Sequence, residues 1–410
     1  MQLANQANEK LAPLKQLTAE QQMLVSEAET FVQNHFLDKR PSVFVISGEA
    51  GTGKSVVLSQ LYYDLQSAAK SPEGRLSGST NYFIVNHPEL LKVYRNIAGR
   101  LPNEYKKNFQ RPTTLINQCR KNGTGFDVGI IDEAHLLLSQ PDHYNNFYGD
   151  NQLVDLLKLC RVLIIVFDAH QVLRLKTYWT ETRLKQVLAP YSQQWVTLHA
   201  QFRMHADNAL IDWINTLTTS GRLDSITPSF SNHYDFRVFN DAEKMHQQIV
   251  ARNNEVGLSR ILSTTGYPSI LDGGNHYIVE GNFSLPWDQY NYTATPWAEL
   301  PESINEVGSI YTCQGFDLNY TGIILGPPVH LAPDGEHIMI DTTKITDPEA
   351  FKKRPDMQAE KDIHEAKMTL MLNAINVIMK RGVKGLYLYA HDVRLRNRLF
   401  QAYKLGGQQQ

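Results

Sequence analysis

The stretch Gly48-Glu49-Ala50-Gly51-Thr52-Gly53-Lys54-Ser55 matches the pattern G-x-x-x-x-G-K-[ST] of a phosphate-binding loop. An apolar run at residues 42–47 predicts a buried strand before it, and helically spaced apolar positions predict a helix over residues 56–69. Glycines let the loop curl so that backbone N–H groups point at a phosphate, and the helix adds its positive end. We therefore expect this loop to bind a nucleoside triphosphate, with Lys54 on the phosphates and Ser55 on Mg²⁺.

The composition is that of a globular protein. The length of 410 residues favours two or three domains, and the hydrophobic and charged shares of 42% and 20% are ordinary. No apolar run is long enough to span a membrane, and the polar first ten residues lack a signal core, so we expect a cytoplasmic protein. The net charge of −2 indicates no strong general affinity for nucleic acid, so any such contact must come from local basic patches.

Strand and helix patterns alternate along the chain, which predicts an α/β protein with parallel sheets. In the first half we expect strands at 42–47, 81–86, 127–132, 162–168 and 195–199, and a helix at 88–98. In the second half we expect strands at 236–239, 277–280, 309–312, 322–325, 337–340 and 385–389, and helices at 241–252 and 362–379. A polar stretch at 221–232 predicts a linker. We therefore divide the chain into a helical segment 1–40, domains 41–232 and 233–405, and a disordered tail 406–410.

Acidic residues follow the predicted strand that ends at residue 132. Hydrolysis at a phosphate-binding loop needs an acidic residue for Mg²⁺, and we assign Asp132 to it. Glu133 follows directly and is our candidate general base for the attacking water. Gln171, after the next strand, would sense the γ-phosphate. Arg203, after the fifth strand, would neutralise charge in the transition state, with a surface salt bridge as the alternative.

These motifs resemble those of a known family. The phosphate loop, Asp-Glu-Ala-His at 132–135, Asp-x-x-Gln at 168–171 and Gln-Phe-Arg at 201–203 follow the order and spacing of superfamily-1 helicases. Residues 306–320 resemble helicase motif V, and residues 376–385 resemble motif VI. The residues of both motifs are most similar to those of the Schlafen-like DNA/RNA helicase group, also called domain of unknown function 2075. The resemblance runs over residues 42–391.

The resemblance implies two RecA-like parallel-sheet domains with ATP in a cleft between them. It implies a Mg-ATP-dependent helicase-like hydrolase in which Gln314 and Gly315 couple ATP to nucleic acid. Arg381 would be the arginine finger of the second domain. Asp317 stands where many superfamily-1 enzymes have a glutamate near the ribose, and Lys380 replaces the usual threonine before the finger. Lys380 either alters the site or faces solvent.

Other positions allow two interpretations. Gln21 lies in a segment similar to one whose glutamine reads adenine in superfamily-1 helicases, but Thr18 and Gln21 also fit a helix capping box. Residues 106–111 mix charges with an aromatic ring, as single-strand-binding surfaces do, or form a solvated loop. Trp287 and Trp297 would stack on bases or pack in a core.

Two functional hypotheses follow. The first is an ATP-dependent translocase or helicase that acts on single-stranded DNA or RNA. The second is an ATP-driven conformational switch that recruits a protein partner, as in an antiviral defence or restriction assembly, without unwinding. Glu133 and the two late motifs disfavour a small-molecule phosphotransferase, because such an enzyme needs no carboxylate for water.

Overall fold

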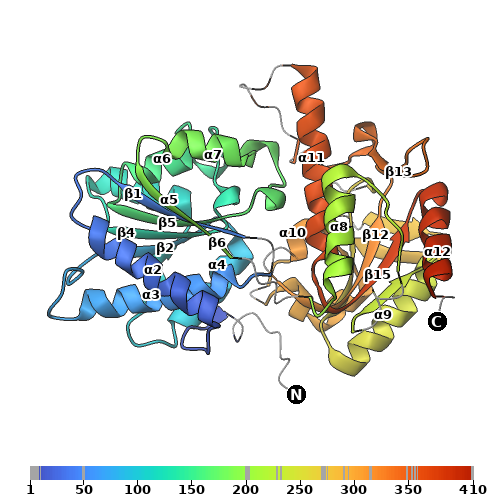
Figure 1. Cartoon of the computed structure of the whole chain (residues 1–410), viewed down its shortest axis with the longest axis horizontal. Coiled ribbons are helices and arrows are strands. Elements are labelled where there is room, and N and C mark those ends of the chain that lie inside the picture. The colour runs from blue at the N-terminus through green and yellow to red at the C-terminus, as the bar shows by residue number, and fades with distance from the viewer. Residues whose placement is uncertain are drawn as a thin grey trace. The chain divides into compact units, whose positions relative to one another are not determined.

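The structure is a computed structural model. It describes residues 9, 11–48, 51–198, 204–227, 230, 233–268, 274, 276–289, 291–293, 295–313, 316–347, 350–351, 354, 357 and 359–407. The chain forms two compact units (Figure 1). The N-terminal unit comprises Ala7–Val172 and Lys176–Gln201, and the C-terminal unit consists mainly of Phe202–Gln410 together with Leu173–Leu175. Among the described helices, none combines the length and apolar character needed to cross a bilayer.

The N-terminal unit is built on a six-stranded sheet with the order β3-β2-β4-β5-β1-β6, and every strand pair in it is parallel. The central strands are continuous apolar runs because helices cover both faces of such a sheet. Figure 1 shows α2 and α3 on one face and α6 and α7 on the other. The strands are β1 (Ser42–Gly48), β2 (Asn81–Val85), β3 (Phe109–Gln110), β4 (Val128–Asp132), β5 (Val162–Phe167) and β6 (Ser192–Leu198). The helices are α2 (Ala19–His35), α3 (Lys54–Lys70), α4 (Pro88–Ala98), α5 (Pro112–Asn122), α6 (Gln152–Leu157) and α7 (Glu181–Leu188).

The C-terminal unit contains a seven-stranded sheet with the order β7-β15-β12-β8-β11-β10-β9. It is parallel except for the antiparallel pair of β9 and β10 at one edge. Separate apolar clusters lie on its two faces, one including α8 and α11 and the other including α9. The strands are β7 (Asp235–Val238), β8 (Ser259–Ser263), β9 (His276–Glu280), β10 (Phe283–Trp287), β11 (Val307–Gly308), β12 (Leu318–Leu325) and β15 (Gly382–Ala390). The helices are α8 (Asn208–Ser220), α9 (Ala242–Val256), α10 (Ile310–Cys313), α11 (Glu360–Met379) and α12 (Val393–Gly407).

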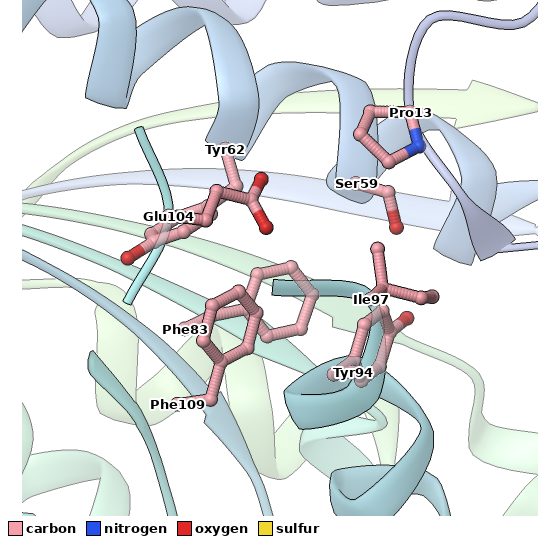
Figure 2. Close-up of a pocket in the computed structure, with 8 residues that line it drawn as sticks. All are labelled: Pro13, Ser59, Tyr62, Phe83, Tyr94, Ile97, Glu104 and Phe109. Atoms are coloured by element: carbon pink, nitrogen blue, oxygen red, sulfur yellow. The ribbon is translucent and has the colours of Figure 1, made fainter. Parts of the chain in front are cut away.

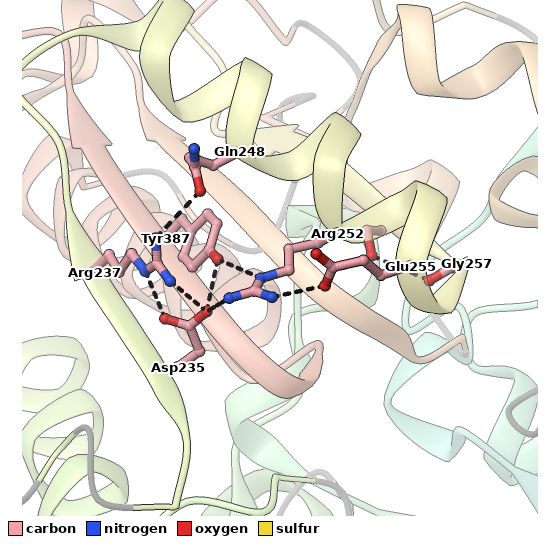
Figure 3. A network of polar contacts seen from close by, with 8 residues as sticks. Asp235, Arg237, Gln248, Arg252, Glu255, Gly257 and Tyr387 are labelled. Atoms are coloured by element: carbon pink, nitrogen blue, oxygen red, sulfur yellow. Dashed lines mark hydrogen bonds and ion pairs between the residues drawn. The ribbon is translucent and has the colours of Figure 1, made fainter.

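A polar network joins β7, β15 and α9 in the C-terminal unit (Figure 3). The Asp235 carboxylate accepts hydrogen bonds from Arg237, from Arg252 and from the Tyr387 hydroxyl. Arg252 also donates to the Tyr387 hydroxyl and to Glu255 near the end of α9. One aspartate therefore holds two guanidinium groups against the edge strand.

One predicted strand is wrong, and another lies outside the main sheet. In place of the predicted strand 309–312, residues 310–313 form α10, because the Ser309 hydroxyl accepts the Tyr311 N–H and starts a helical turn. β11 before it is only two residues long. The strand at 337–340 exists as β14 (Ile338–Ile340), but it pairs with β13 (Val329–Leu331) in a separate two-stranded sheet. The Asp334 side chain accepts two backbone N–H groups in the turn between these strands, which favours the local hairpin.

The predicted domain borders also differ from the structure. α2 packs on α3 and β1, so the first helical segment is part of the N-terminal unit. The first part of the predicted linker 221–232 is anchored, because Leu223 and Ile226 are buried in the same core as α8. The two units therefore divide after Gln201 rather than at residue 232. α12 continues to Gly407, so the predicted tail begins inside a helix, and residues 408–410 lie outside the described residues.

Candidate functional site

The phosphate-binding loop leads from β1 into α3, as the sequence predicts. Gly53 precedes the first helical residue and has a left-handed conformation with φ of 82°, which glycine adopts without strain. Gly48 allows close approach, because a Cβ there would lie 2.9 Å from the Leu198 carbonyl oxygen of β6. Thr52 and Lys54 are buried. The sequence around the loop thus supplies both the curled backbone and the helix start that a phosphate site needs.

Lys54 connects the loop to the end of β5. Its Nζ donates to the Gly48 carbonyl at 2.7 Å and lies 3.7 Å from Asp168 Oδ2. Gln171 Nε2 donates to the same Asp168 oxygen at 2.8 Å. Gln171, the predicted γ-phosphate sensor, is therefore buried and connected to Lys54 through Asp168. The sequence analysis gave Asp168 no role.

Asp132 and Glu133 lie at the end of β4, the neighbour of β5. Asp132 is fully buried, and its Oδ1 accepts the Glu133 N–H at 3.0 Å. Glu133 has a left-handed backbone with φ of 54° and ψ of 50°, which is strained for a residue other than glycine. β1, β4 and β5 are adjacent and parallel, so their carboxyl ends bring the loop, Asp132 and Asp168 to one edge of the sheet.

The two buried aspartates have opposite electrostatic environments. Burial, and then the charge of Glu133, raise the pKa of Asp132 to about 6. Burial alone would also raise the pKa of Asp168, but Lys54 and Gln171 outweigh it and hold that pKa below its usual value. Asp168 therefore stays ionised beside Lys54, whereas the Asp132 carboxylate would gain stability from a divalent cation.

Two side chains that the sequence analysis did not select complete this edge. The buried Tyr94 of α4 donates its hydroxyl to Asp132 Oδ2 at 2.6 Å. Burial and the Asp132 charge raise the pKa of Tyr94 far above its usual value, so the hydroxyl keeps its proton. His135, also fully buried, has Nε2 3.3 Å from Glu133 Oε2. No local sequence pattern indicates the role of Tyr94, because Tyr94 and its partner Asp132 belong to separate strand–helix units.

The donor set fits a triphosphate with Mg²⁺. The Ser55 hydroxyl lies beside Asp132 and lowers its pKa, and a hydroxyl paired with a carboxylate is the oxygen chemistry that Mg²⁺ prefers. Lys54 supplies a buried positive charge next to the loop. Ser55 and Asp132 would hold the metal, and the loop from Gly48 to Lys54 would hold the phosphates.

Predicted residues of the C-terminal unit lie at the starts of two neighbouring strands. Asp317 precedes β12 and Arg381 precedes β15, and the Leu318 N–H donates to the Arg381 carbonyl. Arg381 is fully buried, and its Nη1 donates to the Phe316 carbonyl at 3.1 Å. Lys380 does not face solvent: it is buried, and its Nζ donates to Asn215 Oδ1 of α8 at 2.5 Å.

Gln21 forms the capping box that was the alternative to adenine recognition. Its N–H donates to the Thr18 hydroxyl, and its side-chain oxygen accepts the Thr18 N–H. The adenine role stays a prediction. Five predicted site residues lie outside the described residues: Glu49, Ala50, Arg203, Gln314 and Gly315.

The aromatic candidates for nucleic-acid stacking are mostly buried. Trp287 and Trp297 pack in the C-terminal unit, as the core interpretation predicted. Phe109 is also buried, so stacking by this ring of the 106–111 stretch is wrong. The neighbouring Tyr105 is exposed instead, with Lys70 and Lys107 over its ring.

A glycine loop at a strand–helix junction, a buried lysine and strand-end carboxylates define a P-loop nucleotide-binding protein. Residues 41–392 match the family described as Schlafen group 3, DNA/RNA helicase domain. The chain therefore belongs to the Schlafen group 3 helicase-domain family, which confirms the resemblance seen in the motifs.

Similar proteins add little about activity. The chain is 38% identical over 434 residues to the uncharacterized protein YPL245W of Saccharomyces cerevisiae, covering 98% of this chain and 94% of that one. Among solved structures it is similar to the Pif1 helicase from Candida albicans, with a TM-score of 0.36, 13% identity, and coverage of 96% of this chain and 100% of that chain. It is also similar to a DNA replication initiation factor, with a TM-score of 0.28, 10% identity, and coverage of 60% and 64%.

Proposed function

We propose that this protein is a Mg-ATP-dependent, helicase-like ATPase that translocates along single-stranded DNA or RNA. The main support is that Lys54, Asp132, Glu133 and Gln171 converge at neighbouring strand ends in a chain of a helicase-domain family. A nucleotide pocket alone would need no second carboxylate beside the metal ligand.

Each residue has a chemical task in this proposal. Lys54 neutralises phosphate charge, and Ser55 and Asp132 hold Mg²⁺, which when bound offsets the charge of the phosphate oxygens. Glu133 accepts the proton of the attacking water. Gln171, linked to Lys54 through Asp168, would report the loss of the γ-phosphate. Arg203 and Arg381 would stabilise the charge that develops during transfer.

The test is the rate of ATP hydrolysis against single- and double-stranded DNA and RNA. We expect single strands to stimulate hydrolysis, and Lys54→Ala to abolish both basal and stimulated turnover. Lys158→Ala, which changes an exposed lysine of the same unit, is the control and should behave as the native protein. Hydrolysis that is indifferent to every nucleic acid would contradict the proposal.

A strand-displacement assay refines the result. Stimulated turnover with displacement supports a helicase, whereas turnover without displacement or directional movement leaves the nucleotide-driven switch. A pull-down with the ATP-bound protein would then look for the protein partner that this alternative requires.

A further inference from the structure

Tyr94 connects the core of the N-terminal unit to the acidic edge of its sheet. Its hydroxyl donates to Asp132 Oδ2 at 2.6 Å, while Oδ1 of the same carboxylate accepts the Glu133 N–H at 3.0 Å. Because both oxygens accept a hydrogen bond, the carboxylate plane has little freedom to rotate. The proposed metal ligand is therefore held by α4 from one side and by its own chain from the other.

The Tyr94 ring is itself fixed. Its centroid lies 4.4 Å from that of Phe83 and 6.3 Å from that of Phe109, and Tyr94 is 2% exposed. Figure 2 shows these rings around a small cavity, which Tyr62 and Glu104 also line. The cavity measures about 10 Å³, which is room for about one water molecule, so it is no ligand pocket.

The helix that carries Tyr94 is anchored at both ends. At its start the His87 side chain accepts the Leu90 N–H, and near its end the Arg95 guanidinium donates twice to the Phe109 carbonyl, at 3.0 and 2.8 Å. Because ring and helix are both held, the hydroxyl position is set before any ligand arrives. Residues that orient a metal ligand in this way commonly change metal affinity by about 10–100-fold when they are removed.

We propose that Tyr94 is a positioning residue that fixes the Asp132 carboxylate for Mg²⁺, so that the Mg²⁺-dependent part of nucleotide binding depends on its hydroxyl. The inference rests on the proposed function only in that the site binds a Mg²⁺–nucleotide complex. Hydrolysis, nucleic-acid stimulation and translocation are not needed for it.

The test measures binding of the non-hydrolysable ATP analogue AMP-PNP by calorimetry, with excess Mg²⁺ and with EDTA. In the native protein Mg²⁺ should strengthen binding. Tyr94→Phe should lower this Mg²⁺-dependent gain by about tenfold and leave binding in EDTA unchanged. Tyr62→Phe is the matched control, because it removes another buried hydroxyl from the same cluster, one that points to the Asn81 carbonyl at 3.4 Å.

A double-mutant cycle checks that Tyr94 acts through Asp132. In an Asp132→Asn background, Tyr94→Phe should cause no further loss of the Mg²⁺-dependent gain. Phe109→Leu keeps the hydroxyl but loosens the ring, and should cause a smaller loss; it carries the test if Tyr94→Phe does not fold.

Several results would overturn the inference. The first is a Mg²⁺-dependent gain in AMP-PNP affinity that stays at the native value in Tyr94→Phe or in Phe109→Leu. The second is a loss in Tyr62→Phe as large as that in Tyr94→Phe, or a loss of affinity in Tyr94→Phe that is as large in EDTA as in Mg²⁺. The third is that Mg²⁺ has no effect on binding in the native protein. Because no hydrolysis or nucleic acid is involved, failure of the translocase proposal leaves this readout intact. Conversely, if Tyr94 does not position Asp132, the measurement of ATP hydrolysis against DNA and RNA still tests the translocase proposal.

Discussion

At the scale of single residues, the backbone of Glu133 is the clearest sign of function. A left-handed conformation costs a residue other than glycine about 1–3 kcal/mol and persists only where its surroundings hold it. Here the Glu133 N–H is bound to Asp132 and the carboxylate lies beside His135. The strain aims the side chain that we assign as general base, and it is retained by buried neighbours.

Replacing Glu133 by glutamine tests that assignment. Glu133→Gln keeps the shape but cannot accept a proton from water, so ATP hydrolysis should fall by about 10²–10⁴-fold while AMP-PNP binding stays close to native. Single-turnover hydrolysis and calorimetric binding measure the two quantities. If hydrolysis persists at the native rate, the base is another residue.

Glu104 makes the stability of the N-terminal unit depend on pH. Burial raises the pKa of its carboxyl from 4.5 to about 7. The folded protein then holds this proton over a range in which the unfolded chain has lost it. Stability from this group is complete below pH 4.5 and declines as the pH rises through 7.

We expect Glu104→Gln to flatten this profile. At pH 8 the variant should be more stable than the native protein by about 2 kcal/mol, a value reduced from the full shift because the site is not wholly dry, and at pH 4 the two should agree. Denaturant unfolding at both pH values is the measurement. Glu73→Gln, at an exposed position, should show no such difference, and a gain equal at both pH values would point to packing instead.

Residues within one continuous motif were the most predictable part of the site. Lys54, Asp132 and Glu133 follow strands whose apolar runs are visible in the sequence, and the structure brings them to one edge. Tyr94 was missed because its partner Asp132 belongs to another strand–helix unit, and packing alone brings the two together. His135 lies in the Asp-Glu-Ala-His motif beside its partner Glu133, but it was given no role. Gln21 allowed two interpretations because a helix capping box and an adenine-binding segment have the same sequence pattern.

At the scale of elements, the Asp235 network connects three elements at one edge of the C-terminal sheet. It secures edge strand β7 to β15 and to α9 through one carboxylate and two guanidinium groups. Arg237 and Arg252 also lie over the rings of Tyr387 and Tyr320. Removing the aspartate leaves two partly buried positive charges facing each other.

Asp235→Ala should therefore destabilise the C-terminal unit. We expect a loss of about 2 kcal/mol in the free energy of unfolding, at the lower end for broken buried pairs because the network is partly exposed. Asp224→Ala, which breaks the exposed pair with Arg222, is the control and should leave the unfolding midpoint unchanged. Equal effects of the two changes would show that the network adds nothing beyond a surface pair.

Element prediction succeeded where a buried parallel strand makes a continuous apolar run, as in β1, β4, β5 and β15. It failed where local side-chain bonding decides the outcome, as at Ser309, whose hydroxyl begins α10. β10 was missed because Pro286 interrupts its pattern. The strand tolerates this proline because β10 pairs with the two-residue β11 only at Trp287, next to the proline. β8 was missed although it is fully buried, since it is short and flanked by polar residues.

At the scale of the whole molecule, two α/β units with mainly parallel sheets confirm the predicted fold class. The border was misplaced because it was set at the polar stretch 221–232, whereas α8, which precedes that stretch, already packs in the core of the second unit. The sequence carries no mark for this choice, which depends on which sheet face α8 covers.

The arginine-finger role of Arg381 is a prediction at this scale. Arg381→Lys keeps the charge but loses the planar fork, so we expect the maximal rate of ATP hydrolysis to fall by at least about 10²-fold with little change in AMP-PNP affinity. Arg394→Lys, on the exposed start of α12, is the control. Native turnover in Arg381→Lys would remove Arg381 from the catalytic set.

The segment Leu173–Leu175, which belongs to the C-terminal unit although it lies within the N-terminal part of the sequence, limits how the chain can be divided. Leu175 gives its N–H to the Ala350 carbonyl and accepts a bond from Arg354, and both leucines are buried. A fragment starting at residue 202 would lack this insert, while a fragment ending at residue 201 would expose its two leucines to water. Separately expressed halves should therefore be poorly soluble alone and should complement each other when they are produced together, because the tripeptide carried by the first fragment fills its place in the second.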